Sequence, residues 1–98
     1  MVDVVTVVNK TIWKWKLRVK ETQVINMPSG AEVLSIQTQQ GSPVLWALVN
    51  EDNPLTSRTF ATYGTGFIMP ENPGKYIGSY QNKLETLVFH VFEQEVVE

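Results

Sequence analysis

In the segment 11–19, apolar and charged side chains alternate from Trp13 onward, and this pattern restricts the fold more than any other feature of the sequence. One face carries four apolar side chains: Trp13, Trp15, Leu17 and Val19. The opposite face carries one apolar side chain and three cations: Ile12, Lys14, Lys16 and Arg18. Because successive side chains of a strand point to opposite faces, the segment is predicted to be a β-strand with one buried face.

The same period of two continues along the chain, and no segment keeps helical apolar spacing over three turns. Further strands are predicted at 23–27, 32–40, 44–49, 58–63, 75–81 and 84–94. In the segment 32–40, Leu34 and Ile36 are expected on one face and Val33 on the other. The segment 44–49 is apolar on both faces, which is typical of a central strand.

These strands predict a single all-β domain over residues 1–98. We expect a compact β-sandwich or flattened barrel of seven to eight short, mostly antiparallel strands. Residues 1–8 and 94–98 are interpreted as terminal extensions of this domain. The apolar segments 2–8 and 96–97 are expected to add edge strands or to pair with another subunit, which makes a homo-oligomer the predicted assembly.

Composition excludes several classes of protein. The 98 residues contain no cysteine and one histidine, His90, so disulfides, thiol nucleophiles, cysteine-ligated zinc and histidine-rich metal sites are excluded. Eight Lys and Arg against ten Asp and Glu provide no general basic field for DNA or RNA. No apolar run approaches the roughly 20 residues of a membrane helix, and no signal-peptide pattern is present. A cytosolic protein without a membrane partner is expected.

Large aromatic side chains with polar edges are candidates for contact with a ligand. They are Trp13, Trp15, Trp46, Tyr63, Tyr76 and Tyr80. Such residues either pack in the core or offer a stacking surface to a planar ring such as a nucleobase. Core packing is the favoured interpretation for Trp15 and Trp46, and both interpretations stay open for the other four.

The sharpest local motif is Tyr63-Gly64-Thr65-Gly66. Two glycines let the backbone approach a ligand closely, and successive N–H groups there can bind an anion with help from the Thr65 hydroxyl. The alternative is an ordinary turn.

Cations form the second candidate group. Lys14, Lys16 and Arg18 lie in one stripe, with Arg58 elsewhere, and they are interpreted either as a phosphate clamp or as a solvated face. His90 is interpreted as a hydrogen-bonded structural residue, because no Ser-His-Asp order or carboxylate pair accompanies it. No catalytic residue, metal ligand or cofactor is therefore predicted, and the chain is not expected to be an enzyme.

Several blocks occur in a characteristic order: LWALV at 45–49, YGTG at 63–66, PGKYIG at 73–78 and LVFHVFE at 87–93, preceded by shorter blocks at 12–14, 27–31 and 34–37. Together they resemble a family of small bacteriophage and prophage proteins that is catalogued as a domain of unknown function. The resemblance covers roughly residues 9–93. Two positions depart from the family pattern: Phe67 replaces a histidine, and 82–86 replaces a glycine-rich stretch.

The resemblance implies a phage anti-defence sponge that captures a nucleotide second messenger without cleaving it. The ligand would be a cyclic dinucleotide or an ADP-ribose derivative made by a defence system such as CBASS or Thoeris, in the cytoplasm of the infected bacterial host. Its expected site combines the 63–66 backbone with rings and cations: Trp13, Phe67 or Tyr80 for stacking, and Lys14, Lys16, Arg18 or Arg58 for the phosphates.

Two other functions compete with this one. The first is a phage structural or host-interaction protein that acts through protein–protein contacts. The second is a small hydrolase, which requires His90 to be hydrogen-bonded to a carboxylate in a cleft.

Overall fold

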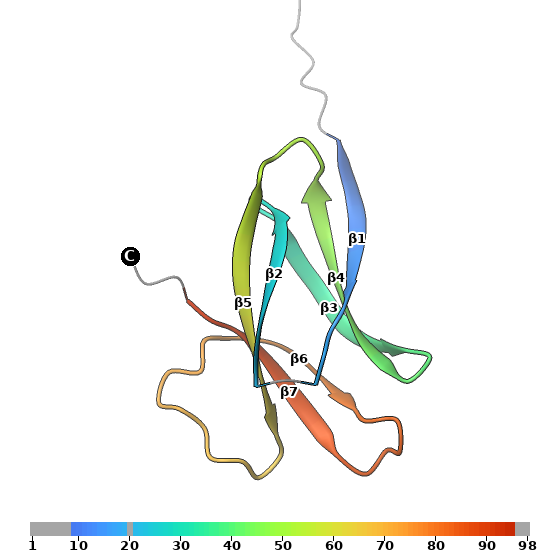
Figure 1. Cartoon of the computed structure of the whole chain (residues 1–98), viewed down its shortest axis with the longest axis vertical. Coiled ribbons are helices and arrows are strands. Elements are labelled where there is room, and N and C mark those ends of the chain that lie inside the picture. Colours follow the sequence, from blue (N-terminus) through green and yellow to red (C-terminus); the bar gives the residue numbers. More distant parts are fainter. Residues whose placement is uncertain (1–8, 20, 96–98) are drawn as a thin grey trace, which may run out of the picture.

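The computed structural model describes residues 9–19 and 21–95 (Figure 1). This part of the chain contains seven strands and no helix. In chain order they are β1 (Lys10–Lys16), β2 (Thr22–Pro28), β3 (Glu32–Gln39), β4 (Ser42–Asn50), β5 (Leu55–Gly64), β6 (Lys75–Gln81) and β7 (Val88–Glu93). The all-β prediction is confirmed, and each strand overlaps one of the predicted segments.

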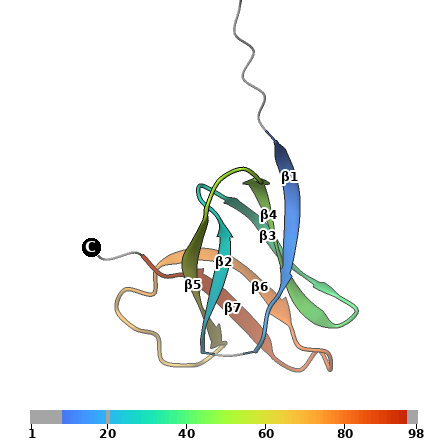
Figure 2. The same ribbon diagram turned by 45° about the horizontal axis from the view of Figure 1, so that its top comes forward.

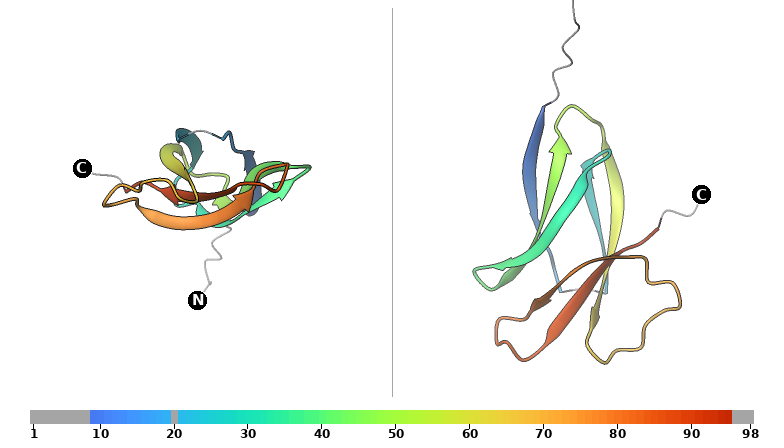
Figure 3. Two further views of the ribbon diagram at one scale, coloured as in Figure 1. Left: turned by 90° about the horizontal axis from the view of Figure 1, so that it is seen from below. Right: turned by 180° about the vertical axis from the view of Figure 1, so that it is seen from behind.

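The strands form two antiparallel sheets that do not close into a barrel. One sheet has the order β1-β4-β3 and the other β2-β5-β7-β6. The long strand β5 holds the second sheet together, because its first part pairs with β2 and its last part with β7. The β5–β6 loop and the β6–β7 turn project from the same end of the molecule (Figures 1 and 3).

The core lies between the two sheets, and its largest fully buried side chains include Met27, Leu45, Phe60 and Val91. Strand β4 is the middle strand of its sheet, as its two-sided apolar pattern predicts. Trp13 and Trp15 pack against the core from β1, on the face that alternation assigned to them. β1 and β2 are each an outer strand of their own sheet, and the ribbons of β3 and β4 lie between them in the turned view of Figure 2.

Three local expectations were wrong. A β-bulge between Val33 and Ser35 shifts the register of β3, so Val33 packs against the core while Leu34 is 46% exposed. Trp46 lies on the outer face of its sheet and not in the core, because the inward positions of β4 beside it belong to Leu45 and Ala47.

The third error concerns the start of β7, which begins at Val88 and not at residue 84. The Asn82 side-chain carbonyl accepts hydrogen bonds from the backbone N–H groups of Thr86 (2.8 Å) and Leu87 (3.0 Å). These bonds hold the preceding residues in a turn and delay the strand. The predicted terminal strands at 2–8 and 96–97 lie outside the described residues. Within the described part of the chain, no helix has the length and apolarity needed to cross a bilayer.

Candidate functional site

The glycine-rich motif forms a tight turn where β5 ends. The Thr65 N–H donates to the Val88 carbonyl at 3.0 Å, and the Phe67 N–H donates to the Gly64 carbonyl at 3.0 Å. Gly66 has φ +90°, a conformation that side-chain-bearing residues rarely adopt. The Phe67 ring lies directly against Gly64, where an added Cβ would meet a ring carbon at 2.9 Å. Gly64 therefore makes room for the Phe67 ring.

This turn forms one side of a shallow hollow of about 290 Å³, which we call the aromatic hollow. Its lining residues are Gly64, Thr65, Gly66, Phe67, Met69, Tyr76, His90 and Phe92. The Tyr76 and Phe92 rings meet edge to face with centroids 5.4 Å apart, and Tyr63 supports Phe92 at 5.9 Å. Four of the predicted ligand-binding residues, Gly64 to Phe67, thus lie together with the Tyr76 and Phe92 rings, whereas the predicted Tyr63 contacts Phe92 without lining the hollow.

A row of hydrogen-bonded polar side chains crosses the aromatic hollow. His90 Nε2 lies 2.7 Å from Thr65 Oγ1, and His90 Nδ1 lies 2.7 Å from Ser79 Oγ. Ser79 Oγ is in turn 2.6 Å from the Tyr76 hydroxyl. The register explains this arrangement, because His90 is the direct cross-strand partner of Ser79.

The polar row can be hydrogen-bonded in either direction. A neutral imidazole has one donor and one acceptor nitrogen, and each hydroxyl can both donate and accept. A protonated His90 would donate to both hydroxyls, and Thr65 would then still have an acceptor in the Val88 carbonyl, 3.3 Å from its Oγ1. The row can therefore present either a donor or an acceptor to a ligand. Both hydrogen-bond partners of the His90 ring are hydroxyls, so among the described residues His90 is not bonded to the carboxylate that the hydrolase hypothesis requires.

Two of the predicted stacking residues lie away from the aromatic hollow. Trp13 packs against Trp15 with centroids 6.1 Å apart, and its indole N–H donates to Glu51 at 3.3 Å. Tyr80 is only 6% exposed and packs on Phe89 in the core, with centroids 5.5 Å apart. Burial raises the pKa of the Tyr80 phenol. Neither ring offers an open face to a ligand at the aromatic hollow.

The predicted cations also lie away from the aromatic hollow. Lys14 donates to the Gln39 side chain at 2.9 Å, and its ammonium lies 5.4 Å from the centroid of the Trp46 ring. Lys16 and Arg18 line a separate hollow beside β2.

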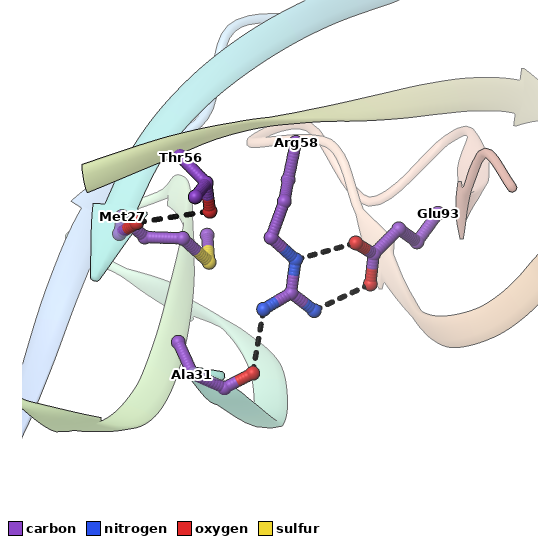
Figure 4. A network of polar contacts seen from close by, with 5 residues as sticks. All are labelled: Met27, Ala31, Thr56, Arg58 and Glu93. Atoms are coloured by element: carbon purple, nitrogen blue, oxygen red, sulfur yellow. Dashed lines mark hydrogen bonds and ion pairs between the residues drawn. The ribbon is translucent and has the colours of Figure 1, made fainter. Parts of the chain in front are cut away.

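Arg58 is engaged in the ion pair drawn in Figure 4. Its guanidinium donates to both Glu93 carboxylate oxygens at 2.5 and 2.7 Å and to the Ala31 carbonyl at 2.5 Å. The hydrogen bonds that Arg58 donates to the Glu93 carboxylate are the main cause that raises the pKa of Arg58. Arg58 thus connects β5, β7 and the residue before β3. Because Glu93 already neutralises its charge, Arg58 is not free to hold a phosphate.

Sequence reasoning missed the residues that complete the aromatic hollow, Met69, Tyr76, His90 and Phe92, and Ser79, which is hydrogen-bonded to two of them. Tyr76 was identified as a possible stacking residue but was not placed in the site. The two-residue spacing of His90 and Phe92 indicates one face of a strand, but it does not identify what that face meets. Among the described residues, no group of three His, Cys, Asp or Glu side chains is arranged to hold a metal ion.

Comparison with known proteins identifies a family whose function is unknown. Residues 8–98 match the model of a domain of unknown function, DUF7352. No curated protein and no solved structure matches the chain.

Proposed function

The chain belongs to the DUF7352 family, and from the geometry of its aromatic hollow we propose that it is a non-enzymatic binding protein for a small molecule with a flat ring. The proposed ligand is a nucleotide second messenger of bacterial anti-phage defence, which the protein sequesters uncleaved in the cytoplasm of an infected host. This is the sponge activity that the resemblance to phage proteins implies.

One observation carries this proposal: aromatic faces and polar groups border the same hollow. Phe67, Tyr76 and Phe92 can contact the faces of a ring, while the Thr65 hydroxyl, held by His90, can pair with its polar edge. Stacking on an aromatic side chain contributes roughly 1–3 kcal/mol per base. Such a site recognises a nucleobase through the combination of stacking and hydrogen bonds.

The charges around the site set the expected salt dependence. The lining residues of the aromatic hollow include no Lys or Arg. The phosphates of a bound nucleotide would consequently remain in solvent, and affinity should depend only weakly on ionic strength. In this proposal the phosphates are therefore not held by Lys14, Lys16, Arg18 and Arg58, the cations that the sequence analysis assigned to them.

A thermal-shift panel of cyclic dinucleotides and ADP-ribose derivatives tests the proposal. A ligand present at about 100 times its Kd should stabilise the fold by about 2.7 kcal/mol. Phe67→Ala should weaken binding by about tenfold or more through loss of a stacking face. Ile68→Ala is the matched control, since Ile68 is 97% exposed next to Phe67 but does not line the hollow. No stabilisation by any nucleotide, or recovery of a chemically altered ligand, would contradict the proposal.

A protein partner is the second candidate function. It is favoured by the apolar exposure of the same loop, where Phe67 is 66% exposed and Ile68 almost completely so. Contiguous exposed apolar side chains often mark protein–protein contacts. In that case Ile68→Ala should weaken the contact, whereas nucleotide capture should be unaffected by it.

A further inference from the structure

The free edge of β2 is defined by the hydrogen bonds that flank the strand. In an antiparallel pair, residues that bond to the partner alternate with residues whose N–H and C=O point away from it. The Thr62 N–H donates to the Glu21 carbonyl at 3.0 Å, and the Ser29 N–H donates to the Pro54 carbonyl at 2.8 Å. These bonds assign the odd-numbered residues of β2 to β5. The backbone groups of Thr22, Val24 and Asn26 therefore point to the free edge.

The same reasoning defines the free edge of β1. The Leu17 N–H donates to the Pro43 carbonyl at 2.9 Å, and the Glu51 N–H donates to the Asn9 carbonyl at 3.0 Å. Odd-numbered residues of β1 thus bond to β4, and Lys16 directs its backbone groups to the free edge.

The Gln23 side-chain amide already pairs with the backbone of Arg18, which continues the free edge of β1 just after the strand ends. The Arg18 N–H donates to Gln23 Oε1 at 3.1 Å, and Gln23 Nε2 donates to the Arg18 carbonyl at 2.8 Å. One primary amide thus satisfies both backbone groups of a residue, as a peptide group of a neighbouring strand would. The Gln23 amide takes the place of an added strand at the end of this edge.

Beyond Gln23 the two free edges border a hollow of about 570 Å³, which we call the edge groove. Five consecutive residues of β2 line it: Thr22, Gln23, Val24, Ile25 and Asn26. Trp15, Lys16 and Arg18 complete the lining. Because side chains of a strand alternate between faces, consecutive lining residues mean that the groove runs along the edge of β2 and not along one face.

The edge groove carries positive charge. Lys16 and Arg18 line it, and neither forms an ion pair within residues 9–19 and 21–95. Charged side chains on an edge strand, Lys above all, discourage the addition of strands that do not offset their charge. Lys16 and Arg18 attract a strand that carries carboxylates.

We propose that the edge groove binds an extended acidic peptide segment of a protein partner. The segment adds as a strand along the free edge of β2, with its backbone opposite Thr22, Val24 and Asn26. Its carboxylates pair with Lys16 and Arg18. Backbone hydrogen bonds supply affinity in this mode, and the charges select the sequence.

A fluorescein-labelled octapeptide of alternating Glu and Val tests the proposal by fluorescence anisotropy with the full chain. We expect saturable binding of this peptide and none of the matched Lys and Val peptide. Arg18→Glu should weaken binding about tenfold or more through charge repulsion. Lys83→Glu is the matched control, because it makes the same charge change in the β6–β7 turn, outside the edge groove.

Backbone pairing is tested separately from charge. Val24→Pro removes an N–H that points to the free edge, a position where an edge strand tolerates proline. It should abolish binding while circular dichroism stays that of the wild type. Should Val24→Pro fail to fold, two N-methylated versions of the Glu and Val peptide replace it. One is methylated at the odd-numbered residues and the other at the even-numbered residues. The version whose methyl groups block the N–H groups facing β2 should lose binding.

Four results would overturn the proposal: no binding of the acidic peptide to the wild-type chain, equal affinity for Arg18→Glu, full affinity for a folded Val24→Pro variant, or full affinity for both N-methylated peptides. These readouts are independent of nucleotide capture. Phe67 lines the aromatic hollow and not the edge groove, so Phe67→Ala should leave peptide binding unchanged.

Discussion

Tyr80 has a phenol in the core whose oxygen has no hydrogen-bond partner among the described residues. Burial raises its pKa above the ordinary value of 10.0, because the interior disfavours the phenolate. The unfolded chain ionises near the ordinary value. The contribution of Tyr80 to stability is therefore complete below about pH 10 and is lost as the pH rises through the folded-state pKa.

Tyr80→Phe is expected to leave the fold as stable as the wild type at pH 7, or more stable by up to about 1 kcal/mol, since it removes an unpaired hydroxyl. Between pH 9 and about pH 11 the variant should lose less stability than the wild type. Urea unfolding at several pH values measures this, with Tyr63→Phe as the control outside the core. Identical alkaline losses for Tyr80→Phe and the wild type would show that the phenol does not carry the effect.

Arg58 provides a second single-residue prediction. Arg58→Met should destabilise the fold by about 1–3 kcal/mol, because it leaves the partly buried Glu93 carboxylate and the Ala31 carbonyl without their donor. Arg18→Met, which changes an exposed arginine, should stay within about 0.5 kcal/mol. Denaturation midpoints compare the two variants, and equal midpoints would mean that the ion pair contributes nothing.

At the scale of the element, the bulge in β3 decides which side chain reaches the core. One extra residue on the strand reverses the alternation of the residues before it. Val33 then packs inward and Leu34 faces solvent, although strict alternation from Ile36 places Leu34 inside. The bulge therefore determines the cost of truncating each of these two neighbours.

Val33→Ala should cost about 1 kcal/mol or more, whereas Leu34→Ala should cost about 0.5 kcal/mol or less despite removing more apolar atoms. Thermal or urea unfolding of the two variants provides the comparison. The reverse order of stabilities would place Leu34 in the core and exclude the bulge.

At the scale of the whole molecule, two sheets with free edges and an exposed apolar loop leave surface that a second copy can cover. We expect a homodimer or larger assembly in solution. Light scattering at micromolar concentration should give at least twice the mass of one chain, and Ile68→Asp should reduce it if the loop forms the contact. The mass of a single chain for the wild type would contradict this prediction.

The sequence by itself determined the strands, because side-chain alternation is a local consequence of extended backbone geometry. It also identified the 63–66 turn, since Gly66 adopts a positive φ that other residues rarely take. Exceptions arose where a neighbouring strand or a side chain intervened, as at the β3 bulge and at Asn82.

Only the tertiary structure decided which distant residues meet. His90 lies between Ser79, eleven residues away, and Thr65, twenty-five residues away, because of the pairing and register of β5, β6 and β7. The same pairing joined Arg58 to Glu93 and separated the cations from the aromatic hollow. Alternation reports which face a side chain occupies, whereas register depends on the fit of whole faces across the core, and that fit is not a property of any single segment.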